Sequence, residues 1–236
     1  MIINGIDIEV FNARQLRVSI GHMETTNASA WAAGSAVPYF ARNRYGFKRV
    51  TVTLMVKGDD RDEIKRNCAG ILGLITGRTE FTLDGFDTFF VGALSMTPTR
   101  EERSRQIWHN LTMEFNAYEY MRPVEYTGTS SIEVYNPGTV ESPAIVTLSP
   151  SVRINPVHLT GICHDSNTGT DLPVTVPEME QGEDVIIDGI TGLITQDGDP
   201  KDIDAWTLPS FKPGITTVTC DSSFVDVTIK VYPIVG

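Results

Sequence analysis

Histidine and cysteine are the first residues to consider for catalysis, because they supply general bases, nucleophiles and metal ligands near neutral pH. The chain has four histidines and three cysteines, and only Cys163 and His164 are adjacent. Neighbouring residues of a β-strand point to opposite faces, so this pair is not expected to share a site. Three cysteines without a CxxC spacing predict neither a disulfide framework nor a zinc site, and buried thiols are the simpler interpretation.

A group of aspartates, Asp197, Asp199, Asp202 and Asp204, could hold a cation. An EF-hand loop has glycine at its sixth position and glutamate at its twelfth. Counted from Asp197, these positions hold Asp202 and Leu208. A solvated acidic loop is the simpler interpretation, and an irregular cation site is the alternative. We predict no bound metal and no cofactor.

Catalytic signatures are missing from the chain. GxSxG, HExxH, the Walker A motif and GxGxxG do not occur. A glycosidase would need two carboxylates facing each other across a cleft, and no spacing among the acids selects such a pair. We therefore predict no catalytic residues and a protein that is not an enzyme.

Residues 37–49 form the densest aromatic and basic run, and they contain no acid. Such a run can bind single-stranded nucleic acid, mark a protein interface or take part in ordinary packing. The acidic remainder of the chain favours an interface. The predicted subunit-interface residues are Trp31, Tyr39, Phe40, Arg42, Arg44, Tyr45 and Phe47.

Charge is distributed unevenly along the 236 residues. Residues 1–126 contain 15 basic and 15 acidic residues, whereas residues 127–236 contain 4 basic and 15 acidic residues, so the net charge of −11 lies in the second part. This asymmetry indicates two domains, 1–126 and 127–236. It argues against specific nucleic-acid binding, which needs a basic surface. A basic arm on one subunit could instead meet the acidic domain of another.

Composition favours a globular chain with a sizeable core, since 41% of residues are hydrophobic and 21% are charged. No apolar run is long enough to cross a bilayer, so no membrane partner is expected. The N-terminal residues MIINGIDIEV lack the basic and apolar regions of a secretory signal.

Apolar alternation predicts strands at Ile6–Val10, Leu16–Ile20 and Arg49–Lys57, and the pattern stops between residues 22 and 47. A loop of that length is usually functional or disordered. Helical spacing of apolar residues then predicts one helix at about residues 60–76.

The start of this helix has a capping-box pattern, Asp60 followed by Glu63. Gly77 is the expected stop. After a linker-like stretch at 127–131, the chain is a series of short strands separated by turns, which is typical of a sandwich or a jelly roll. The predicted fold class is mainly β.

The order of these features resembles the distal tail protein family of siphophages, often called Dit. The segments that carry it are KRVTVTLMVKGDDRDEIKRNCAGILGLI, NAYEYMRP, IEVYNPGTVESPAIVTLSP, DVIIDGITGLITQDG and LPSFKPGITTVTC. Asn136–Pro143 resembles the family's N-x-G-T…P segment, and Ile186–Gly192 resembles its I-x-I-D…G hairpin. Leu208–Gly214 resembles its P-x-L-x-P-G turn, with Phe211 near the usual leucine.

The resemblance implies a fold. Residues 1–126 would form a tail-tube-like β-sandwich with one flanking helix at about 60–76 and an extended arm at about 22–47. Residues 127–236 would form a galectin-like β-sandwich.

The resemblance also implies a role. Subunits would form a homo-hexameric ring between the tail-tube protein and the tail-tip or tail-associated protein. The ring would be a hub for adhesion and a passage for DNA. The protein would be synthesised in the bacterial cytoplasm and belong to the virion tail.

Other functions stay open. A carbohydrate-binding module is one, with Trp206 and Tyr135 as candidate aromatic platforms, although each is expected in the core. A glycan partner is therefore possible. A tail-associated hydrolase would need signatures that the chain lacks. Another baseplate or tail-tube subunit is the remaining alternative.

Overall fold

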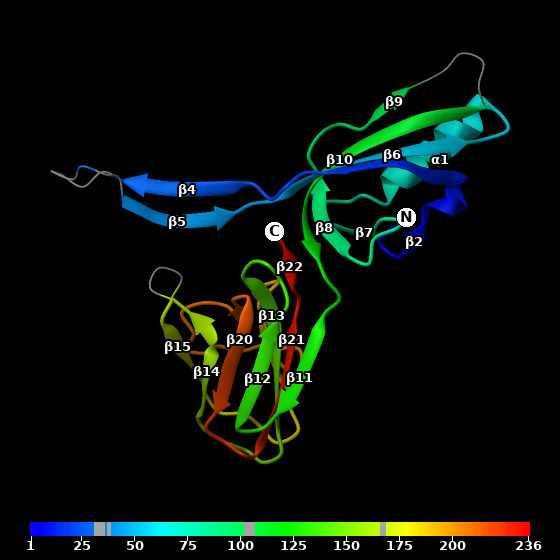
Figure 1. The fold of residues 1–236 in the computed structure, drawn as a ribbon. Coiled ribbons are helices and arrows are strands. Elements are labelled where there is room, and N and C mark those ends of the chain that lie inside the picture. Colours follow the sequence, from blue (N-terminus) through cyan, green and yellow to red (C-terminus); the bar gives the residue numbers. More distant parts are fainter. Residues whose placement is uncertain (31–35, 37–38, 102–106, 166–168) are drawn as a thin grey trace. The chain divides into compact units, whose positions relative to one another are not determined.

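The computed structural model divides into two compact units, Met1–Met121 (the first unit) and Arg122–Val235 (the second unit) (Figure 1). Both consist mainly of antiparallel strands, which confirms the mainly β prediction. The residues that the structure describes are 1–30, 36, 39–101, 107–165 and 169–236.

Strands of the first unit form one continuous sheet in the order β2-β1-β7-β8-β10-β6-β3. The long strand β10 pairs along one edge with β6, and along the other with β9 and then β8. The sequence analysis expected a β-sandwich here, and the structure joins these strands in one hydrogen-bonded sheet. The bounds are β1 Ile2–Ile3, β2 Ile6–Asp7, β3 Ala13–Ile20, β6 Lys48–Lys57, β7 Thr79–Thr82, β8 Phe89–Leu94, β9 Thr99–Glu101 and β10 Trp108–Tyr120, with the 3₁₀ helix η1 at Ile8–Phe11.

The core of this unit follows from strand alternation. Val50, Val52, Leu54 and Val56 of β6 are all buried on one face, as are the apolar residues of β10 opposite them. Three phenylalanines lie deepest: the Phe81 ring centroid is 5.3 Å from that of Phe90 and 4.6 Å from that of Phe115.

The helix α1 (Arg61–Gly73) buries Ile64, Cys68 and Ile71. The Asp60 carboxylate accepts a hydrogen bond from the Glu63 amide at 2.7 Å, as the capping pattern predicts. The Glu63 carboxylate reaches back to the Asp59 amide at 2.6 Å, one residue before the N-cap. The helix ends three residues before the predicted position 76.

Residues 22–47 contain two paired strands where the sequence analysis expected a loop. Strand β4 (Thr25–Ala30) pairs with β5 (Tyr39–Tyr45) in a separate two-stranded sheet (Figure 1, blue). It continues the β3–β6 hairpin, because the Gly21 amide donates to the Arg49 carbonyl and the Gly46 amide to the Glu24 carbonyl. The apolar alternation that reveals β6 is missing here, so the sequence pattern did not predict these strands.

The second unit packs two sheets around one apolar core. One sheet has the order β11-β21-β13-β16-β17-β18, with β19 on β13, and the other has the order β12-β20-β14-β15. The bounds are β11 Val124–Gly128, β12 Ser131–Asn136, β13 Ser142–Pro150, β14 Val157–His164, β15 Asp171–Val176, β16 Val185–Asp188, β17 Ile194–Gln196, β18 Asp199–Pro200, β19 Ser210–Phe211, β20 Gly214–Cys220, β21 Val225–Val231 and β22 Ile234–Val235.

The division between the units lies slightly earlier than the expected boundary after residue 126. Strand β11 pairs with β21, so residues 124–126 belong to the second sandwich. The linker-like stretch 127–131 ends β11 and turns into β12. Its Gly and Ser residues serve a turn between strands.

Two short polar side chains explain the motifs that carry the family resemblance. The buried Asn136 amide nitrogen donates to the Phe211 carbonyl at 2.7 Å, while its oxygen accepts from the Gly138 amide at 2.8 Å. The Asp188 carboxylate accepts hydrogen bonds from the Ile190 and Thr191 amides. Both motifs therefore hold turns, which is a structural role.

At two glycines of the first unit, we expect substitution by alanine to have opposite effects on stability. A Cβ on Gly92 of β8 would lie 2.2 Å from the Asn116 carbonyl oxygen, whereas a Cβ on Gly73 of α1 would meet nothing within 4 Å. Gly92→Ala should destabilise the unit by about 1–3 kcal/mol through overpacking. Gly73→Ala should be neutral or stabilise by up to about 1 kcal/mol. Urea unfolding measures the free energy of unfolding of both variants. Equal changes in the two variants would contradict this prediction.

Candidate functional site

Six of the seven predicted interface residues lie on β5 or two residues after it. Trp31 lies outside the described residues. Tyr39, Phe40, Arg42 and Arg44 belong to β5, where the backbone of each pairs with β4, and Tyr45 ends the strand. Tyr45 and Phe47 are exposed on 50% and 45% of their surface, so two aromatics at the base of the hairpin are open to solvent.

Phe47 begins a row of aromatic rings on the first unit. Its ring centroid lies 4.7 Å from that of Tyr118, which lies 6.4 Å from that of Tyr120. Tyr120 stacks on Phe89 at 5.3 Å. Tilted and offset rings at these distances attract each other. The row therefore holds Phe47, which lies between β5 and β6.

A buried ion pair lies next to this row. The Lys48 ammonium donates to Glu119 Oε2 at 2.8 Å, and the Thr88 hydroxyl donates to Glu119 Oε1 at 2.8 Å. The Lys48 and Glu119 side chains are only 6% and 11% exposed. Two charges withdrawn from water are stable only while each keeps its partner. The pair therefore connects the first residue of β6 to β10.

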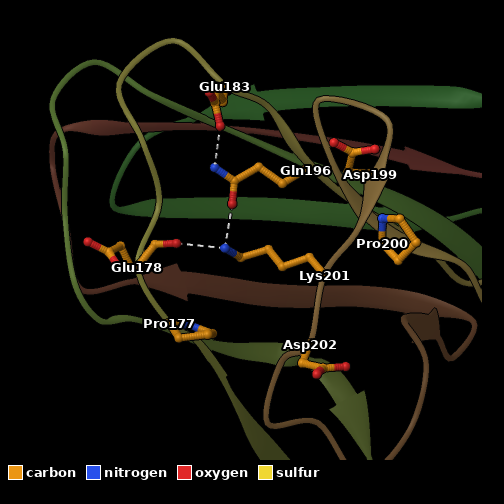
Figure 2. A pocket seen from close by; sticks show the side chains of 8 residues that line it. All are labelled: Pro177, Glu178, Glu183, Gln196, Asp199, Pro200, Lys201 and Asp202. Atoms are coloured by element: carbon orange, nitrogen blue, oxygen red, sulfur yellow. Dashed lines mark hydrogen bonds between the residues drawn. The ribbon is translucent and has the colours of Figure 1, made fainter.

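The aspartates of the predicted acidic loop are all exposed. Asp197 and Gly198 have positive φ angles and turn β17 into β18, so Asp197 serves a hairpin turn. Asp199 and Asp202 border an open depression of about 540 Å³ (Figure 2). Asp204 lies beyond it, on the segment that pairs with Thr175.

Lys201 also lines this depression, as Figure 2 shows. Its ammonium donates to the Glu178 carbonyl at 2.6 Å and to Gln196 Oε1, and the Gln196 amide donates to Glu183 at 2.7 Å. The Lys201 cation in the wall of the depression opposes metal binding there. Across the described ranges, no three His, Cys, Asp or Glu side chains lie close enough together to hold a metal ion.

Cys163 and His164 are both buried, but their side chains have different partners. The Cys163 thiol donates to the Thr207 carbonyl at 3.0 Å, and His164 Nδ1 lies 2.7 Å from Asp171 Oδ1. Burial raises the pKa of the Cys163 thiol. A nucleophile needs the thiolate, so this arrangement does not activate Cys163.

Both candidate aromatic platforms are exposed, which corrects the expectation that they belong to the core. Trp206 is 82% exposed and Tyr135 is 52% exposed. Tyr135 lies on β12 opposite Ile215 of β20, and its carbonyl accepts a hydrogen bond from the Tyr126 hydroxyl at 2.6 Å. Their apolar type suggested burial, but both occupy outward positions of their segments.

Within the described ranges, no helix has the length and apolar character needed to span a bilayer. Two exposed features could engage another molecule, namely the aromatics at the hairpin base and Trp206.

Comparison with solved structures relates this fold to components of phage hub and baseplate assemblies. One is SPP1 Dit (gp 19.1), described as a paradigm of the hub adsorption apparatus in phages that infect Gram-positive bacteria. It matches with a TM-score of 0.69 and 14% identity, covering 98% of this chain and 96% of that chain.

Chains of the phage P2 baseplate in its activated conformation also match. The calcium form gives a TM-score of 0.56 at 10% identity, and the strontium form 0.57 at 11% identity. Each covers 96% of this chain and 92% of that chain. No protein-family model matches the chain, and a search of curated proteins gives no significant match.

Removing one partner of the buried ion pair should be costly. Lys48→Met leaves the Glu119 carboxylate buried without its cation, and we expect a loss of about 3–5 kcal/mol. The matched control is Arg49→Met, because Arg49 is 63% exposed and lies 3.5 Å from Glu114. That change should cost at most about 1 kcal/mol. Urea unfolding compares the two, and similar losses would show that burial of the pair is unimportant.

The thiols should be unreactive in the folded chain. Burial raises the pKa of Cys68, Cys163 and Cys220, so less thiolate forms at a given pH. Iodoacetamide labelling at pH 8, followed by mass spectrometry, should be slow until urea is added. Cys68 should react first, because it borders a depression and the nearby Arg100 charge partly offsets its shift. Rapid native labelling of Cys163 would contradict this prediction.

Proposed function

We propose that the protein is a siphophage distal tail protein, a structural hub subunit between the tail tube and the tail-tip proteins. The observation that carries this proposal is the fold shared with SPP1 Dit over 98% of the chain. A likeness that spans both units is more specific than a likeness to one sandwich, because single sandwiches serve many functions.

In this proposal the first unit is the tail-tube-like, ring-forming domain, and the second is the galectin-like domain. The continuous sheet with one helix in the first unit and the two-sheet sandwich in the second support the assignment. The ring would be a homo-hexamer within the virion tail, with the tail-tube and tail-tip proteins as neighbours.

The β4–β5 hairpin is the proposed arm. A ring built from one repeated head-to-tail contact needs two different, complementary surfaces on each subunit. The hairpin pairs only within itself among the sheets of the described chain, and the aromatics at its base are exposed. Its basic residues are opposite in sign to the acidic part of the chain after residue 127.

A non-enzymatic role agrees with the polar chemistry of the molecule. Cys163 and His164 are bound to separate partners, and Lys201 lines the acidic depression. DNA would pass through such a ring without sequence-specific contacts, since the net charge of −11 opposes tight binding.

The ring proposal predicts the mass of the purified protein. Light scattering behind a sizing column should give a species near six times the 26.0 kDa subunit, or a doubled ring. Replacing residues 25–45 by Asn-Gly should reduce this mass to that of the monomer. The two-residue turn closes the β3–β6 hairpin at its existing register, so the first unit keeps its sheet.

The control is an unchanged urea-unfolding midpoint and circular dichroism spectrum in the shortened chain. A shortened chain that still forms the full-size ring would show that the hairpin is not the clasp. A full-length chain that stays monomeric at high concentration would contradict self-assembly of the ring.

A further inference from the structure

Residues 202–208 form a segment that is held beside β15, the edge strand of one sheet of the second sandwich. The Asp204 amide and carbonyl both bond to Thr175 of β15 at 2.9 Å. The Thr207 carbonyl accepts the Cys163 thiol at 3.0 Å, and Ile203 and Ala205 pack against the core. The backbone is therefore fixed on both sides of Trp206.

With the backbone held in this way, apolar and acidic side chains of the segment face solvent. Exposure alternates along the segment, so Asp202, Asp204, Trp206 and Leu208 face solvent. Trp206 exposes 82% of its surface and Leu208 exposes 40%. A tryptophan offers a large apolar area and is seldom left so open by a fold that has a core available.

A second loop enlarges the apolar area. A Cβ on Gly192 would lie 3.5 Å from Leu208 Cδ1, so the turn between β16 and β17 lies against Leu208. The next residue, Leu193, is 64% exposed. Leu193, Trp206 and Leu208 together are called the Trp206 patch, and the exposed Asp202 and Asp204 of the same segment are called its acidic rim.

We propose that the Trp206 patch is a docking site for another protein, whose surface offers an apolar pocket bordered by lysine or arginine. An apolar centre with a polar rim is the anatomy of protein interfaces, and tryptophan is enriched among the residues that dominate binding. The acidic rim, within a part of the chain that has 4 basic and 15 acidic residues, requires a basic partner. This inference goes beyond the ring proposal and rests on the second unit alone.

Charge and shape disfavour the other occupants. The same face of a second copy would oppose acid to acid, which costs binding energy in a two-fold contact. Anionic polymers are repelled for the same reason. A neutral glycan prefers an aromatic ring with polar neighbours, whereas Leu193 and Leu208 are aliphatic and exposed.

The test uses the full chain as bait for a yeast-displayed library of random peptides, followed by affinity titration. Selected peptides should combine apolar residues with lysine or arginine. Trp206→Ala should weaken their binding about 30-fold or more. The matched control is Ile215→Ala, which removes a residue of the same unit that is 71% exposed and should change affinity by less than about twofold.

The rim is tested by the double variant Asp202→Asn and Asp204→Asn. It should weaken binding of the same peptides and flatten its dependence on salt. Failure to enrich any peptide, or equal binding to Trp206→Ala, would overturn the proposal. So would tighter binding of neutral N-acetylglucosamine oligomers than of any selected peptide, or loss of a self-assembled species in Trp206→Ala. The ring mass of the wild type tests the hub proposal separately.

Discussion

The antiparallel register between β6 and β10 is the constraint on which the first unit depends. It directs one face of both strands into the core and brings Lys48 to Glu119 at its end. The residue before Lys48 is Phe47, which lies on Tyr118. A slip of one residue would move every side chain to the opposite face. The same register therefore determines the core, the buried ion pair and the point at which the hairpin leaves the sheet.

The second unit depends on short polar side chains in its turns. Asn136 joins the turn after β12 to β19, and Asp188 closes the turn after β16. These residues belong to the segments that resemble the distal tail family. Each side chain satisfies buried or constrained backbone groups that an apolar residue would leave unpaired.

The features proposed for function are surfaces. In the first unit they are the hairpin and the aromatics at its base, and in the second they are the Trp206 patch and its acidic rim. Lys201 lines the acidic depression, and the buried Cys163 and Cys220 thiols donate to backbone carbonyls. A protein that works by assembly needs complementary, charged and apolar surfaces more than a reactive cleft.

Alternation and helical spacing in the sequence by themselves determined the mainly β class, the β6 strand and the helix α1 with its Asp60 cap. These signals are local, because burial on one face imposes a period on the residues. Only the tertiary structure decided that β4 and β5 pair with each other, since these strands lack such a period. It also decided that Trp206 faces solvent and that Lys48 meets Glu119. Both depend on which distant strands lie alongside, and residue type alone does not specify that neighbour.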